Sequence, residues 1–247
     1  MNTTSIISPV SKRPRLAMLF VLAGILALLY FGAIAPEVLS TWLPFTLSTN
    51  PFVDAKLKYQ IATFVLALVV LSFVYALYPD NARRFYKMGN LSAPAEPVKW
   101  LGIKPTDNWK TVGRSFAVIV SLATGAFVYF NVARGQSLDA GNIRYLPLIL
   151  IFAAMNAFTE EAITRLSVVT ALDGFIRRPS IYLISAIIFG VPHFFGVPGG
   201  ILGSLMAGFL GWLLAKSIAE TEGMFWAWFI HFLQDVIIYG GLFLAVA

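Results

Sequence analysis

Residues 146–172 read LPLILIFAAMNAFTEEAITRLSVVTAL, and this stretch decides the fold. It is longer than the roughly 20 apolar residues that a helix needs to cross a bilayer, yet Glu160, Glu161 and Arg165 lie inside it. An ionisable group at bilayer depth costs about 2.5–3.5 kcal/mol even on lenient insertion scales, so such groups need a polar cavity or one another. The stretch therefore predicts a transmembrane helix that carries a functional site.

Helical geometry places these charged side chains on two different faces of the helix. Glu161 and Arg165 are four residues apart, so they face one another and can form an ion pair. Glu160 points about 100° away, on the face that also carries Asn156 and Thr164. We expect one carboxylate to be neutralised locally and the other to be available for chemistry.

The composition of the whole chain indicates a polytopic membrane protein. Of its 247 residues, 58% are hydrophobic and only 12% are charged, whereas soluble domains carry about 25% charged residues. The mean hydropathy is +0.78. The net charge of +6 comes from basic residues in short connecting loops, so membrane topology explains it better than nucleic-acid binding. The absence of cysteine excludes disulfides, thiolate metal ligands and a thiol nucleophile.

Seven apolar segments predict an all-α, polytopic transmembrane bundle surrounded by membrane lipids. Polar connections separate them, chiefly residues 36–58 and the long basic connection 81–114, whose Trp100 and Trp109 suit an interface. The expected spans are Leu16–Ala35, Tyr59–Tyr78, Ser115–Val132, Tyr145–Leu172, Ile181–Val197, Gly199–Lys216 and Met224–Ala245.

The distribution of basic residues predicts the orientation of the bundle. With the amino terminus in the cytoplasm, thirteen of the 18 lysines and arginines fall on the cytoplasmic side and four fall outside. Such an asymmetry is typical of the positive-inside rule. We therefore expect an integral protein of a bacterial-type plasma membrane with its amino terminus in the cytoplasm.

Two local patterns predict how the later spans pack. Gly199, Gly203, Ala207, Gly211 and Ala215 recur every four residues, which indicates a ridge that a neighbouring helix can approach closely. Pro192 removes a backbone hydrogen bond beside His193, so we expect a kink or break there.

The two histidines of the chain, His193 and His231, both fall within predicted spans. Helix geometry places them at depths where they can meet Glu160. His231 and Asp235 are four residues apart on one face, so we expect the aspartate to orient the imidazole or share its task. These groups suit general acid–base activation of water, with or without a metal. A structural role, in which they only lock the bundle, is the alternative.

Three motifs resemble those of the CAAX-protease and bacteriocin-processing family of intramembrane proteases. Residues 160–165, EEAITR, resemble its EExxxR motif; residues 189–193, FGVPH, contain its FxxxH motif; and residues 231–235, HFLQD, resemble its HxxxN/D motif. They occur in the expected order on separate spans. The resemblance divides the chain into residues 141–247, a protease-like membrane core, and residues 1–140, which carry no family motif.

The resemblance implies a role for each motif residue. Glu160 and His193 would activate a water for attack on a peptide carbonyl, and His231 and position 235 would stabilise the oxyanion. Glu161 and Arg165 would support the site. We also expect Asn156 to be a supporting residue, because it shares a helical face with Glu160.

The last motif position holds Asp235 where an asparagine is common in the family. A carboxylate only accepts hydrogen bonds, so Asp235 fits an oxyanion hole when protonated and fits a partner of His231 or a metal ligand when ionised. Zn²⁺ is therefore an open alternative to a metal-free site, with Glu160, His193, His231 and Asp235 as candidate ligands.

These observations favour an intramembrane endopeptidase that acts on a membrane-embedded or lipid-modified peptide, such as the prenylated substrates that the resemblance implies. A proton- or ion-coupled transporter is the alternative from another class, because acids and histidines in a bilayer also form proton relays. A non-catalytic immunity or scaffold protein on the same fold is the third reading.

Overall fold

The computed structural model describes residues 13–34, 37–134, 140–195 and 199–246. Over these ranges the chain is helical and forms no sheet, which confirms the predicted fold class. Seven helical segments are long and apolar enough to cross a membrane, as predicted. The predicted ends of the first and fifth spans, Ala35 and Val197, lie outside the described residues. The seven segments are Pro14–Gly32, Pro51–Leu77, Trp109–Ala133, Gly141–Leu172, Arg178–Phe195, Gly200–Thr221 and Phe225–Leu244.

The second span begins earlier than predicted, because its polar first turns are satisfied within the helix. Helix α3 covers Pro51–Leu77, so residues 51–58 are helical and not part of a loop. The Asn50 side chain accepts hydrogen bonds from the first backbone N–H groups of α3, which is the usual N-cap arrangement. Lys58 pairs with Asp54 at 2.9 Å. The remaining connection also contains a short helix, α2, at Glu37–Trp42.

The third span also begins earlier than predicted. Helix α5 covers Trp109–Val128 and is capped by Asn108, which accepts a hydrogen bond from the Thr111 N–H. The preceding connection contains helix α4 at Pro79–Phe85 and a 3₁₀ turn at Lys99–Leu101. The polar connection is therefore shorter than predicted.

The two tryptophans of this connection differ in environment. Trp100 is 71% exposed, as expected for an interfacial residue, but Trp109 is fully buried. Its indole Nε1 donates to Glu220 at 2.8 Å, so Trp109 packs inside the protein and fixes the linker to α9.

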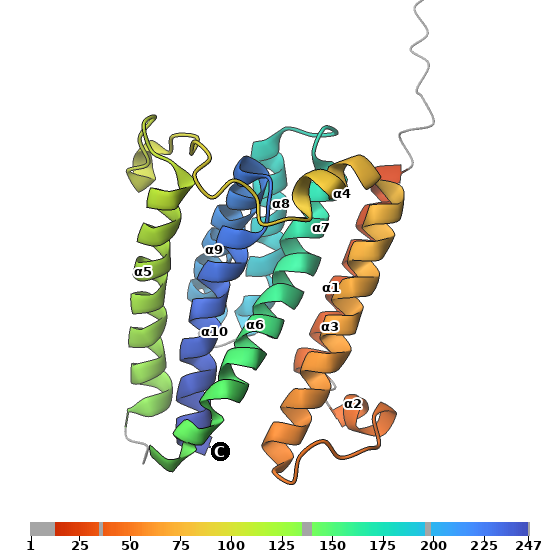
Figure 1. The fold of residues 1–247 in the computed structure, drawn as a ribbon, viewed down its shortest axis with the longest axis vertical. Coiled ribbons are helices and arrows are strands. Elements are labelled where there is room, and N and C mark those ends of the chain that lie inside the picture. Colours follow the sequence, from red (N-terminus) through yellow and green to blue (C-terminus); the bar gives the residue numbers. More distant parts are fainter. Residues whose placement is uncertain (1–12, 35–36, 135–139, 196–198, 247) are drawn as a thin grey trace, which may run out of the picture.

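The helices surround the acidic motif from several sides (Figure 1). Helix α10 (Phe225–Val246) and helix α6 (Leu146–Glu161) stand at the centre of the view, and α6 continues into α7 (Ser167–Leu172). Helix α5 flanks them on one side and α1 (Arg13–Leu29) with α3 on the other. Helices α8 (Arg178–Gly190) and α9 (Gly200–Thr221) lie behind. We call the end of the bundle that carries α4 and the connection to α5 the linker end.

Small residues bring α8 and α9 into close contact, as the sequence predicts. A Cβ on Gly211 would lie 2.8 Å from the Ser185 carbonyl oxygen, and one on Gly190 would lie 2.7 Å from the Ser204 carbonyl oxygen. The other helical members of the predicted ridge, Gly203, Ala207 and Ala215, are buried, whereas Gly199 precedes the helix. Because the contacts involve backbone atoms, no larger residue fits at Gly211 or Gly190 without separating the helices.

Helix α9 extends past Lys216, where the sixth span was predicted to end, and reaches Thr221. Lys216 is buried and pairs with Glu220 one turn later. A paired lysine can remain inside the bundle, since its charge is compensated there. Glu220 also accepts a hydrogen bond from the Glu96 backbone N–H, at 3.1 Å, which fixes the linker to α9.

A group of ion pairs fastens the linker end. Arg84 donates from Nε to Glu222 Oε1 at 2.7 Å and from Nη1 to Asp173 Oδ2 at 2.9 Å, and Arg178 donates to the second Asp173 oxygen. The hydrogen bond from Arg84 lowers the pKa of Glu222 below its ordinary value of 4.5, and the same bond raises the pKa of Arg84. The group joins α4 to the ends of α7, α8 and α9.

Candidate active site

The acidic motif lies where the helix changes its winding. After Glu161 the backbone forms a π-helical turn, η6, at Ala162–Leu166. The Ser167 hydroxyl donates to the Ala162 carbonyl oxygen at 2.6 Å, and its backbone N–H bonds to the same oxygen. Such single wide turns are common at functional sites. The sequence gives no indication of this turn.

Glu161 forms the centre of a buried charge network. Its Oε1 pairs with Arg165, as predicted, and also lies 2.7 Å from His231 Nδ1. Both Glu161 and Arg165 are fully buried, and the Arg165 guanidinium lies 3.8 Å from the centre of the Phe189 ring. The aromatic face contributes a favourable cation–π contact. Glu161 therefore fixes Arg165 and the His231 ring.

Glu160 points elsewhere and has a different environment. Its Oε1 accepts a hydrogen bond from Asn156 Nδ2 at 3.1 Å, which agrees with the shared face predicted from sequence. Its Oε2 lies 3.6 Å from His231 Nε2. The side chain is 22% exposed, whereas Glu161 is fully buried. Glu160 is thus the accessible carboxylate of the pair.

Asp235 does not orient His231 as expected from their spacing. Its Oδ2 lies 3.7 Å from His231 Nε2, beyond hydrogen-bonding distance, while Glu161 holds the other ring nitrogen. Asp235 Oδ2 instead accepts a hydrogen bond from Asn156 Nδ2 at 3.1 Å. The four-residue spacing on one helix predicted Asp235 as the partner of the His231 ring. In the fold, Glu161 on α6 lies closer to the imidazole than Asp235 does.

His193 lies at the predicted break. Helix α8 ends at Gly190, and Pro192 begins a 3₁₀ turn over Pro192–Phe195. His193 Nδ1 lies 2.6 Å from the Phe189 carbonyl oxygen. Because a carbonyl only accepts, Nδ1 carries the proton and Nε2 is left as an acceptor.

Glu160 and His193 line one cavity of about 200 Å³. Its other polar lining residues are Thr164 and Tyr59, and the remaining wall is apolar or glycine. Much of that wall comes from α1, the π-helical turn that follows it, and α3. The sequence gives no indication that these helices contact the motif residues. Sequence reasoning missed Tyr59, because it stood at the edge of a predicted span and belonged to no motif. His231 and Asp235 are not in the cavity wall and lie behind Glu160.

The candidate metal ligands are not arranged as a metal site. In the part of the chain that the structure describes, no group of three or more His, Cys, Asp or Glu side chains is placed to hold a metal ion. His231 has one ring nitrogen bonded to Glu161, and Asn156 occupies an oxygen of both Glu160 and Asp235. We derive no step through a metal.

Comparison with known proteins identifies the family of this region. Residues 142–237 match the family model described as type II CAAX prenyl endopeptidase Rce1-like. The match contains all three motifs. No curated protein and no solved structure matches the chain. Family membership implies a membrane protease with peptide substrates. Residues 142–237 are therefore a domain of the type II CAAX prenyl endopeptidase Rce1-like family.

Proposed function

We propose that the protein is an intramembrane endopeptidase that hydrolyses a peptide bond of a membrane-embedded or lipid-modified substrate. One observation carries the proposal: the accessible Glu160 and His193 line the same cavity within the bundle. Beside it, the Glu161 carboxylate forms an ion pair with Arg165 and is bonded to His231 Nδ1. The arrangement leaves one carboxylate and one imidazole for chemistry.

Glu160 and His193 together suit the activation of water. A water in the cavity would donate one hydrogen bond to Glu160 and the other to His193 Nε2, both of which are acceptors. Glu160 would take the proton as the water oxygen attacks the carbonyl carbon. Asn156 holds Glu160 Oε1 at 3.1 Å, which keeps the carboxylate in place. When the C–N bond breaks, the leaving nitrogen receives that proton.

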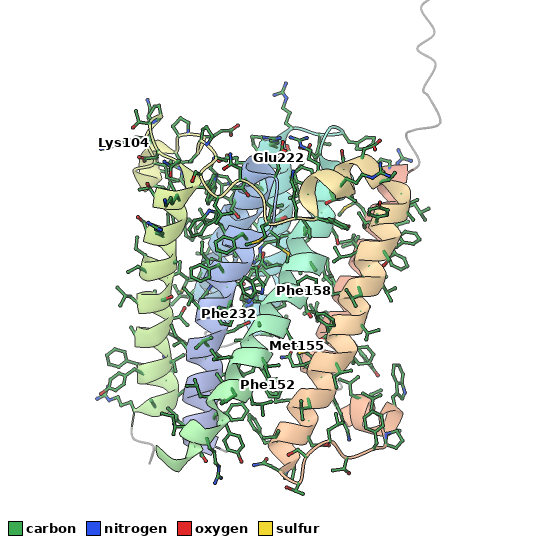
Figure 2. All side chains as sticks on the ribbon, viewed as in Figure 1. Lys104, Phe152, Met155, Phe158, Glu222 and Phe232 are labelled. Atoms are coloured by element: carbon green, nitrogen blue, oxygen red, sulfur yellow. The ribbon has the colours of Figure 1, made fainter. Side chains whose placement is uncertain are left out.

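A second cavity supports an apolar substrate. It has a volume of about 540 Å³ and is lined mostly by apolar side chains, which come from α3, α6, the π-helical turn η6, α10 and the linker residues 86–88, with Lys87 among them. Phe158, one of its lining residues, lies on α6. Figure 2 labels it together with Phe152 and Met155, which lie on the same helix. An apolar cavity of this size can bury a hydrophobic side chain or a lipid chain.

The basic connection 81–114 supports one orientation. The start of α1 and the basic connection both lie at the linker end, and loops rich in Lys and Arg stay in the cytoplasm. We place the linker end on the cytoplasmic side.

Comparison of membrane proteomes tests the proposed function. Cells that make the wild-type protein are compared with cells that make Glu160→Gln, and new peptide termini in membrane proteins are quantified. Asp80→Asn is the matched control, since it also converts a carboxylate to an amide but its side chain is 94% exposed. We expect termini that require Glu160 and are present in the control. Identical termini in all three samples would contradict proteolysis and favour transport or a scaffold role.

A further inference from the structure

The proposed reaction requires a hydrogen-bond donor for the carbonyl oxygen, which gains negative charge during attack. The family resemblance assigns that task to position 235 and His231. In this chain the Asp235 carboxylate accepts from Asn156. Asn156 Nδ2 has two hydrogens, and both are donated, one to Glu160 and one to Asp235. Neither residue has a side-chain N–H left for a substrate.

His231 is not among the residues that line the cavity. Its Nδ1 is bonded to Glu161, and its Nε2 faces carboxylate oxygens of Glu160 and Asp235 at 3.6 and 3.7 Å. A proton on Nε2 would be attracted to these two carboxylates. The donor must therefore come from another part of the fold.

The cavity wall narrows the choice to one side chain. Of its polar residues, Glu160 only accepts, and the Thr164 hydroxyl already donates to the Glu160 backbone carbonyl at 2.6 Å. His193 has donated its N–H to Phe189. The Tyr59 hydroxyl forms no hydrogen bond with any residue that the structure describes; the Thr63 hydroxyl donates to the Tyr59 backbone carbonyl and not to its side chain. Among the described lining residues, Tyr59 has the one side-chain donor that is not already used.

The position of the hydroxyl depends on a glycine. Gly32, in the π-helical turn Tyr30–Ile34 that follows α1, also lines the cavity. A Cβ on Gly32 would lie 3.2 Å from the Tyr59 hydroxyl oxygen, so the glycine leaves the space that the hydroxyl occupies. Both residues lie outside the region that matches the family model.

We propose that the Tyr59 hydroxyl is a catalytic hydrogen-bond donor to the substrate carbonyl oxygen. This proposal rests on the proposed function. As the bond from the water oxygen to the carbonyl carbon forms, the π electron pair moves to the carbonyl oxygen and Glu160 takes the proton. Tyr59 donates a hydrogen bond to that oxygen and keeps its own proton. When the electron pair on the oxygen re-forms the carbonyl bond, the C–N bond breaks and the leaving nitrogen takes the proton from Glu160.

Steady-state kinetics of Tyr59→Phe test the proposal. The probe is a fluorogenic peptide that carries a cleavage sequence found in the proteomic comparison. Removing one oxyanion donor lowers kcat by roughly 10²–10³-fold, and we expect this loss with little change in KM. The ring is retained, so the melting temperature in detergent should not change. Tyr75→Phe is the matched control, because Tyr75 lies on the same helix and is 42% exposed.

A double-mutant cycle with Gly32→Ala separates catalysis from packing. In the wild-type background the added methyl displaces the hydroxyl, so kcat should fall by less than in Tyr59→Phe. In the Tyr59→Phe background no hydroxyl remains to be displaced, so Gly32→Ala should leave kcat unchanged. If Gly32→Ala lowers kcat by the same factor in the wild-type and in the Tyr59→Phe background, the proposal is overturned.

Comparison with Glu160→Gln separates failure of this proposal from failure of the proposed function. If Tyr59→Phe keeps the wild-type kcat while Glu160→Gln is inactive, Tyr59 is not the donor but the protease assignment stands. If Glu160→Gln also keeps the wild-type kcat, Glu160 is not the base and the proposed mechanism is wrong; the proposed function itself fails if the proteomic comparison shows identical termini in all samples.

Discussion

His231 Nδ1 lies 2.7 Å from Glu161 Oε1, the same oxygen that pairs with Arg165. One buried carboxylate thus holds two basic side chains, one from its own helix and one from α10. This relationship explains why two adjacent glutamates have different roles. Glu161 joins the helices, and Glu160 is left accessible in the cavity.

The first prediction concerns Arg165. Arg165→Ala should reduce the amount of folded protein more than Glu160→Gln does, because it leaves the buried Glu161 without its arginine. Removing one partner of a buried pair costs about 3–5 kcal/mol. The double change of Glu161→Gln with Arg165→Met should recover part of the loss. Membrane abundance measures the effect, and equal levels for the three proteins would show that Arg165 is not in a buried pair.

The second prediction concerns Asp235. The buried Asp235 shares the Asn156 amide with Glu160, so two carboxylates are held close together. Asp235→Asn keeps an acceptor for Asn156 and removes one negative charge, so we expect a higher melting temperature and activity at least equal to that of the wild type. Chelators should not change the activity. Stoichiometric zinc in the active protein, lost together with activity in Asp235→Asn, would contradict this.

The third prediction concerns the contact between α8 and α9. Gly211→Leu should destabilise the protein, since even a Cβ would lie 2.8 Å from the backbone oxygen of Ser185. Gly203→Leu, on the same buried ridge, should act in the same direction. Leu202→Ala should have little effect, because Leu202 is 64% exposed. Melting temperatures in detergent measure all three, and unchanged melting of both glycine variants would place the ridge toward lipid.

The fourth prediction is a pH dependence at the linker end. Arg84 lowers the pKa of Glu222, so the folded state binds this proton less readily than the unfolded state. The stabilisation is therefore present above the ordinary pKa of 4.5 and is lost as pH falls through the lower folded pKa. Glu222→Gln should lower the melting temperature at about pH 7, and the difference from wild type should shrink toward about pH 3.5. A difference that grows on acidification would contradict this pairing.

The fold was largely predictable because apolar length determines where a helix can span. Errors occurred at ends such as Lys58 and Lys216, where charge suggested a boundary but an i, i+4 partner compensates it inside a helix. The Glu161–Arg165 pair and the break at Pro192 follow from local geometry and were predicted.

Contacts between distant helices were not predictable from spacing. The bond from His231 to Glu161 joins residues on α10 and α6, and Tyr59 reaches the cavity from a region without family motifs. The π-helical turn at Ala162–Leu166 also has no sequence signal, since its residues are compatible with an ordinary helix.

The central claim is that Glu160 takes the proton from the attacking water, and the hydrolysis rate of Glu160→Gln tests it most directly. The amide cannot accept that proton. The rate is measured with the fluorogenic peptide on purified, monodisperse protein whose melting temperature is compared with that of the wild type. We expect a folded protein without turnover. Turnover at the wild-type rate by the folded variant would contradict the account.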